Sequence, residues 1–255
     1  MTRPFLLSMV ACAAIAAVTP AALATPAPGT LVVAAASDLR DALPALIKAS
    51  GHPELKPTFG SSGKLYAQIV AGAPFDAFFS ADGQLTRKLE AAGRIRPGSR
   101  FAYGVGRLVL WAPATSHVEV TRGLMGLADP AVKQVAIANP EHAPYGRAAV
   151  QALRRAKVWE AVSPKLVLGE NVSQAAQFAG SGAADVGILA RSLMRSPVMA
   201  AGNAWPVPAS WHEPLIQEAV VLRDCAQPKP MAAFMAFVAS PAGRQVLAAY
   251  GFEAP

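Results

Sequence analysis

Leu31-Val32-Val33-Ala34-Ala35-Ala36-Ser37-Asp38 is a short apolar run that passes directly into two polar residues, and a helical pattern follows over 38–49. Apolar runs of this length beside a helical pattern are typical of buried strands in parallel sheets. Ser and Asp are residues that cap the starts of helices. The stretch therefore predicts a strand that ends where a helix begins, which is the unit of α/β folds.

The same alternation continues through the rest of the chain. Strands are expected at 31–36, 55–59, 77–80, 108–111, 135–138, 166–168, 186–189 and 216–222. Helices are expected at 38–49, 64–71, 83–92, 147–156, 173–179, 230–238 and 241–250. Alternation of this kind predicts an α/β fold with mainly parallel sheets.

The length of the chain favours two lobes, because it lies at the upper end of what a single domain uses. We expect residues 30–107 together with 219–255 to form the first lobe, and 108–218 to form the second.

Residues 1–24 are predicted to be a signal peptide. Arg3 gives a positively charged start, 5–18 is apolar, and Ala22-Leu23-Ala24 is a cleavage site of small residues. The apolar run is short for a membrane anchor and breaks at Pro20. A lipoprotein anchored through Cys12 is a weaker alternative. The protein is therefore expected in the periplasm.

Charge and cysteine content narrow the classes of function. The formal net charge is +7, and the basic residues are scattered without interleaved aromatic residues. This pattern argues against a nucleic-acid surface, although a mild positive field favours the approach of an anion. Removal of residues 1–24 takes Cys12 away and leaves Cys225 alone, so no intramolecular disulfide is expected.

Four segments share one design, in which a strand runs into small or polar residues and a helix starts at once: 36–38, 60–63, 143–146 and 170–173. Helix starts bind anions because their free N–H groups and the positive end of the helix dipole face the ligand. Each segment alone could be an ordinary cap. Gly60-Ser61-Ser62-Gly63 offers more hydroxyls than one cap requires. Four such ends converging would solvate a dianion without a buried countercharge.

Catalytic readings of the same residues have little support. Ser61-Ser62-Gly63-Lys64 fits the Ser-x-x-Lys pattern of penicillin-recognising acylases, but the accompanying Ser-Asp-Asn and Lys-Thr-Gly elements are absent. Leu65 stands where a phosphate loop carries a hydroxyl residue. The four histidines are widely separated, so no metal-cation site is expected. We predict a binding protein without a cofactor rather than an enzyme.

Several longer stretches form a recognisable set: Ala34-Ala35-Ala36-Ser37, 59–64 with 67–69, 72–76 leading to 79–82, 139–146, 181–187 and 250–252. Together they resemble the periplasmic molybdate-binding proteins of ABC importers, which have the type II periplasmic-binding-protein fold. The likeness covers nearly the whole mature chain. It implies two α/β lobes that close on a molybdate or tungstate ion in the cleft between them.

The resemblance also implies which residues bind the ion. By motif they are Ser37 and Ser62, which would give hydroxyl and backbone donors from the first lobe, and Tyr145 and Val172, which would give backbone donors from the second. Some family members add a tyrosine hydroxyl after a Gly-Ile-Val strand, but here Ala190 follows that strand. The hydroxyl of Tyr145 is a candidate to compensate.

The implied partners are the membrane permease and the ATPase subunits of the importer, and the protein itself is expected to be a monomer. Two alternatives stay open. The same fold could bind another anion, such as sulfate, thiosulfate or an organic anion, because fold alone does not fix the ligand. A secreted Ser-x-x-Lys hydrolase is the alternative from a different class.

Overall fold

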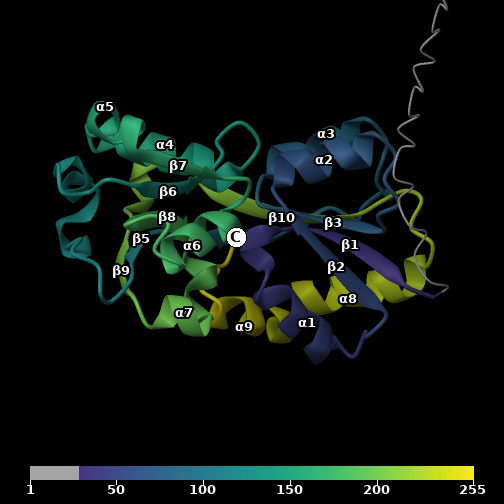
Figure 1. The fold of residues 1–255 in the computed structure, drawn as a ribbon. Helices are drawn as coiled ribbons and strands as arrows, with labels where there is room; N and C mark the ends of the chain where they lie inside the picture. Colours follow the sequence, from purple (N-terminus) through teal and green to yellow (C-terminus); the bar gives the residue numbers. More distant parts are fainter. Residues whose placement is uncertain (1–28) are drawn as a thin grey trace, which may run out of the picture.

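A computed structural model describes residues 29–255, so the predicted signal peptide and Cys12 lie outside the described residues. The fold contains two five-stranded sheets side by side (Figure 1). The first sheet has the order β2-β1-β3-β10-β4, with β1 (Leu31–Ala36), β2 (Leu55–Gly60), β3 (Ala77–Ser80), β4 (Phe101–Gly106) and β10 (Leu215–Val221). The second has the order β7-β6-β8-β5-β9, with β5 (Leu108–Ala112), β6 (Val135–Ala138), β7 (Leu166–Gly169), β8 (Val186–Ala190) and β9 (Asn203–Pro206).

Helices cover both faces of each sheet (Figure 1). The first sheet lies between α2 (Ser62–Val70) and α3 (Gly83–Ala91) on one face and α1 (Ala42–Ser50), α8 (Pro228–Ala239) and α9 (Pro241–Ala249) on the other. The second lies between α4 (Pro144–Arg155) with α5 (Trp159–Val162) and α6 (Val172–Gly180) with α7 (Pro197–Ala200). Short 3-10 turns complete the chain: η1 (Ser37–Leu39), η2 (Val120–Ala128), η3 (Ser163–Lys165), η4 (Arg191–Arg195) and η5 (Ala209–Trp211).

Both sheets are mixed, which corrects the expectation of mainly parallel sheets. β1 is parallel to β2 and β3, and β6 is parallel to β7 and β8. β10 runs antiparallel to β3 and β4, and β5 runs antiparallel to β8 and β9. Two of these antiparallel strands, β4 and β9, were missed. Glycines interrupt β4, and β9 is an edge strand that ends in a proline, so neither carries an apolar strand pattern.

Two connections join the sheets. β4 passes into β5 through Arg107, and the chain returns from β9 to β10 through 207–214. β10 pairs with β4 from Leu215 onward. Sheet pairing therefore begins before the predicted return at 219, and the division into lobes at 30–107, 108–218 and 219–255 stays a prediction.

Each sheet has an apolar core of its own. In the first, the ring of Phe79 lies 5.4 Å from that of Tyr103 and 6.0 Å from that of Phe234, between centroids. In the second, the buried Trp111 donates its indole N–H to the carbonyl oxygen of Met199 at 2.8 Å. Separate cores allow each sheet with its helices to behave as a packed unit.

Within residues 29–255, no single helix is long and apolar enough to cross a membrane. α8 and α9 reach that length and composition only as a pair, and the chain bends by 66° between them. Each of these helices begins with a proline, a position where the missing N–H group costs no helical hydrogen bond.

Candidate anion site between the two sheets

The four predicted helix starts meet at one cavity. Its wall consists of Ala36, Ser37, Asp38, Gly60, Ser61, Ser62, Ala81, Ala143, Pro144, Tyr145, Asn171 and Val172. The predicted ligand positions Ser37, Ser62, Tyr145 and Val172 therefore lie together, and all four are buried. The cavity has a volume of ≈ 10 Å³, which is about the space needed for one water molecule.

Strand register explains why segments far apart in sequence meet here. In the first sheet the parallel strands β1 and β2 end side by side, with Ala36 opposite Gly60. In the second sheet β6 and β7 end in the same way, with Ala138 opposite Gly169. Ligands of open α/β sheets bind outside the carboxyl ends of the strands. Here the carboxyl ends of both sheets face one cavity.

The polar groups in the wall of this cavity are mostly neutral, and small apolar residues fill the rest of it. The helices α2, α4 and α6 begin at it, and the N–H groups of a helix's first turn have no acceptor within the helix. Among the residues that line this cavity, Asp38 alone has a carboxyl group, and none is an arginine, lysine or histidine. Such an arrangement can bind an anion through N–H and hydroxyl groups without an arginine or lysine.

The two serines of the glycine-flanked loop have different surroundings. The Oγ of Ser62 accepts a hydrogen bond from the N–H of Ala81 at 3.0 Å, which leaves the hydroxyl proton free to be donated. The Oγ of Ser61 is buried and has no hydrogen-bond partner among the described residues. Ser61 was not predicted as a ligand position, although it belongs to the segment singled out for its hydroxyls.

The hydroxyl of Tyr145 is engaged by protein groups. It donates to Oδ2 of Asp38 at 2.9 Å and accepts from Nε2 of Gln217 at 3.0 Å. Burial, followed by the negative charge of Asp38, raises the pKa of this phenol well above its usual value. In this structure the hydroxyl therefore links the two sheets rather than replacing the one missing at Ala190.

Asp38 is the functional candidate that sequence reasoning missed. Its carboxyl is buried, and Oδ2 accepts from Nε2 of Gln217 at 2.5 Å as well as from Tyr145. The hydroxyl of Tyr103 donates to Oε1 of Gln217 at 2.6 Å and continues the network. Burial raises the pKa of Asp38 to about 6, although hydrogen bonds from Gln217 and Tyr145 and the nearby N–H of Asp38 itself offset part of this rise.

Further hydrogen bonds join the two halves of the cavity directly. The hydroxyl of Ser173 donates to the carbonyl oxygen of Ser37 at 2.7 Å, and that of Ser192 donates to the carbonyl oxygen of Asp38 at 2.7 Å. The N–H of Gly63 donates to the carbonyl oxygen of His142 at 2.9 Å. The structure is therefore a closed form in which protein groups meet across the cleft.

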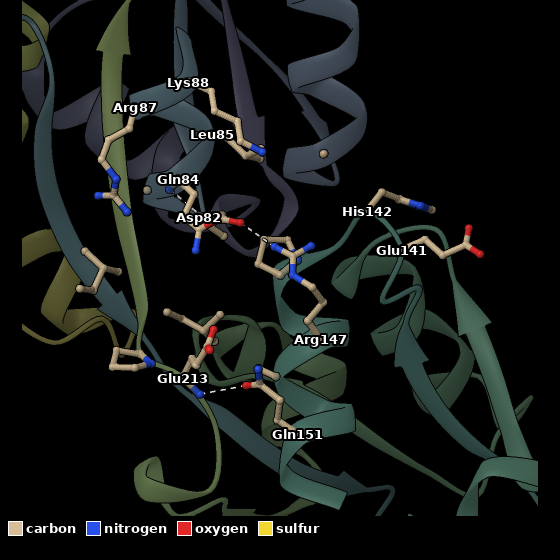
Figure 2. A pocket seen from close by; sticks show the side chains of 18 residues that line it. Asp82, Gln84, Leu85, Arg87, Lys88, Glu141, His142, Arg147, Gln151 and Glu213 are labelled. Carbon is tan, nitrogen blue, oxygen red and sulfur yellow. Dashed lines mark hydrogen bonds and ion pairs between the residues drawn. The ribbon is translucent and has the colours of Figure 1, made fainter. Parts of the chain in front are cut away.

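A larger pocket of ≈ 380 Å³ adjoins this cavity and shares Ala81 and Pro144 with it (Figure 2). Across this pocket, Arg147 forms an ion pair with Asp82 at 2.5 Å. Asp82 also caps α3 by accepting from the N–H of Gln84 at 2.8 Å. These contacts give Asp82 a structural role.

The residues of the alternative hydrolase pattern are not arranged as a nucleophile and base. Lys64 is 48% exposed and pairs with Glu170 at 3.2 Å, whereas Ser61 is buried. Within residues 29–255, no group of three or more His, Cys, Asp or Glu side chains is placed to hold a metal ion.

Comparison with known proteins agrees with this architecture. Residues 31–253 match the family described as bacterial extracellular solute-binding protein. The chain is 39% identical to the molybdate-binding protein ModA of Rhodobacter capsulatus over 76% of this chain and 75% of that one. It is 39% identical to the ModA of Azotobacter vinelandii over 80% of this chain and 81% of that one.

Solved structures extend the comparison to the fold. The Azotobacter vinelandii periplasmic molybdate-binding protein has a TM-score of 0.82 at 34% identity and covers 88% of this chain and 99% of its own. The sulfate-binding protein SubI of Mycobacterium tuberculosis has a TM-score of 0.72 at 15% identity, covering 88% of this chain and 86% of that one, which shows a shared fold alone. The predicted two-lobed α/β fold, the resemblance and the choice of binding protein over enzyme are confirmed. The chain belongs to the bacterial extracellular solute-binding protein family.

Proposed function

We propose that the protein binds molybdate or tungstate and delivers it to an ABC-type importer. The observation that carries the proposal is that the starts of α2, α4 and α6 and the 3-10 turn η1 meet at one cavity, two from each sheet, and that its polar groups are mostly neutral. Relatives that share 39% of their residues with this chain over most of its length are named for molybdate binding. We infer that Ser37, Ser62, Tyr145 and Val172 hold the oxygen atoms of the ion.

The size and donor content of the cavity favour a compact oxyanion over the alternatives. The cavity of ≈ 10 Å³ must widen to admit any ion, and a small tetrahedral oxyanion requires less widening than an organic anion does. A protonated phosphate would bring a donor into a wall made mostly of donors, which lowers its affinity relative to a fully ionised oxyanion. Sulfate has the same charge as molybdate but is smaller. The spacing of the donors would therefore determine the difference in affinity between the two ions.

Capture by lobe closure follows from the placement of the donors. Ser37 and Ser62 lie at the first sheet, and Tyr145 and Val172 lie at the second. An anion can contact all four only when the lobes are closed, so it shifts the population toward the closed form. We take the lobes to be 30–107 with 219–255, and 108–218.

Delivery requires partners beyond the ion. The family is extracellular by description, and the periplasm is the compartment we propose for this protein after removal of residues 1–24. The permease and ATPase subunits of the importer would receive the closed, loaded form. We propose that the protein acts as a monomer.

Isothermal titration of the mature, ligand-stripped protein tests the function. We expect tight binding of molybdate and tungstate with one ion per chain, and no detectable heat from sulfate or phosphate. A preference for sulfate would keep the fold and overturn the proposed ligand. The absence of binding with all four ions would overturn the function.

The substitution Ser62→Ala is expected to weaken molybdate binding by about tenfold to 100-fold, because a hydrogen bond to a charged group contributes about 1.5 to 3 kcal/mol. The matched control is Lys64→Ala, which removes a half-exposed ion pair from the same helix. Exposed ion pairs contribute about 0 to 1 kcal/mol, so this variant should bind almost as the wild type does. An acylating activity lost in both variants would favour the hydrolase instead.

A further inference from the structure

A buried carboxyl lies in the wall of the anion cavity. Asp38 is 1% exposed and lines the cavity beside Ser37. Its Oδ2 accepts two hydrogen bonds, from the hydroxyl of Tyr145 and from the amide of Gln217. Its Oδ1 is also buried but has no well-formed hydrogen-bond partner among the described residues. Protein donors therefore bind Oδ2 of this carboxyl, and Oδ1 remains available for a proton or a ligand.

Among residues 29–255, no positively charged group compensates this carboxyl. The elements packed against η1 are β2, α6 and η4. The hydrogen-bond partners of the side chain come from α4 and β10, and Tyr103 of β4 binds one of those partners, Gln217. The groups that face it are neutral: the phenols of Tyr103 and Tyr145 and the amide of Gln217. α6 carries no charged residue. The nearby cationic side chains are exposed, namely Arg40, Lys56, Arg191 and Arg195, while Asp41 in the next turn adds only a further negative charge.

An ionised Asp38 would oppose the binding of a dianion. The two would share one small cavity whose lining residues Ser37, Ser62, Tyr145 and Val172 are buried, so their repulsion would be weakly screened. Burial, partly offset by the hydrogen bonds to the carboxyl, already raises the pKa of Asp38 to about 6. A dianion in the same cavity raises the pKa of a neighbouring carboxyl further, because like charges disfavour ionisation.

We propose that Asp38 is protonated in the anion-bound form, so that each molybdate or tungstate ion is captured together with one proton. The proton comes from solvent and binds to Oδ1, since Oδ2 already accepts two hydrogen bonds. The neutral carboxyl then becomes one more hydrogen-bond donor in the wall. This inference rests on the proposed function and adds to it the uptake of one proton on binding.

The direction of the pH dependence follows from linkage. In the free closed form the pKa of Asp38 is about 6, and in the bound form it is higher. Between the two values, the bound form holds a proton that the free form lacks, so binding takes up a proton. Affinity therefore falls as pH rises above the free value, by about tenfold per pH unit. Molybdate itself stays a dianion throughout this range.

Titration calorimetry in buffers of different ionisation enthalpy measures the proton directly. At about pH 7.5, the binding enthalpy of molybdate should vary with the buffer's ionisation enthalpy, with a slope that corresponds to about one proton taken up. In Asp38→Asn the slope should be near zero, because the amide is neutral at every pH. At about pH 8 this variant should also bind at least about tenfold more tightly than the wild type.

Asp41→Asn is the matched control, because it removes a carboxyl from the adjoining turn that does not line the anion cavity. It should still take up about one proton per ion. Thermal unfolding checks that each variant is folded. Proton uptake by the wild-type protein is measured on the wild type itself, so that test does not depend on the folding of any variant. Wild-type binding without proton uptake, or with an affinity that is flat between about pH 7 and 8, would overturn the inference and leave the function standing. Absence of any binding would instead overturn the proposed function.

Discussion

Gly63→Ala is expected to weaken molybdate binding by about fivefold to 150-fold, because overpacking at a tight contact costs about 1 to 3 kcal/mol. A Cβ atom on Gly63 would lie 2.6 Å from the carbonyl oxygen and 3.0 Å from the Cα of His142. Both are backbone atoms from across the cleft, so neither can turn aside as a side chain could. The methyl group would hold the lobes apart and remove the hydrogen bond from the N–H of Gly63.

The same substitution should leave the separate lobes intact. Gly63 lies inside α2, where alanine is favoured over glycine by about 0.5 to 1 kcal/mol. We therefore expect the ligand-free protein to melt at the same temperature as the wild type or slightly higher. Calorimetric titration and thermal unfolding measure the two effects. An unchanged affinity would mean that the loaded protein does not close at His142 as described.

The substitution Phe234→Ala should lower the free energy of unfolding by about 3 to 5 kcal/mol, the cost of removing a large buried aromatic side chain. Phe234 is 0% exposed and lies in α8, where its ring contacts those of Phe79 and His52. It attaches the C-terminal helices to the first sheet. Urea unfolding followed by circular dichroism measures the loss.

Phe237→Ala is the matched control, because Phe237 lies one turn further along the same helix and is only partly buried. It should lose clearly less stability. Equal losses in the two variants, or a loss below about 1 kcal/mol in Phe234→Ala, would contradict the assignment of α8 to the core of the first sheet.

The sequence was most informative where local pattern and burial agree. The strands 31–36, 77–80 and 135–138 have the predicted bounds, because each is a buried run flanked by turn or helix signals. The helix starts at 60–63, 143–146 and 170–173 were recognisable for the same reason, whereas 36–38 leads into the 3-10 turn η1 and α1 begins only at Ala42. β4 and β9 were not recognisable, since glycines and an edge proline hide their strand character, and these two strands make each sheet mixed.

The candidate site was predictable only in part. The four helix starts could be found because each carries its own local signal. The hydrogen-bond network of Asp38 could not, because tertiary packing brings Tyr145 and Gln217 to its carboxyl, and Tyr103 to Gln217, from three separate elements. Likewise, nothing local distinguishes the unpartnered hydroxyl of Ser61 from that of Ser62, which accepts from Ala81.

The hydrogen bonds from Ser173, Ser192 and Gly63 across the cleft separate affinity from selectivity. They form on closure whichever ion is inside, so their free energy contributes equally to every closed complex. A common contribution cancels in the ratio of two dissociation constants, which depends only on differences between ligands. The overall strength of capture can therefore be tuned at the donors Ser173, Ser192 and Gly63, while the groups that contact the ion set which ion is preferred.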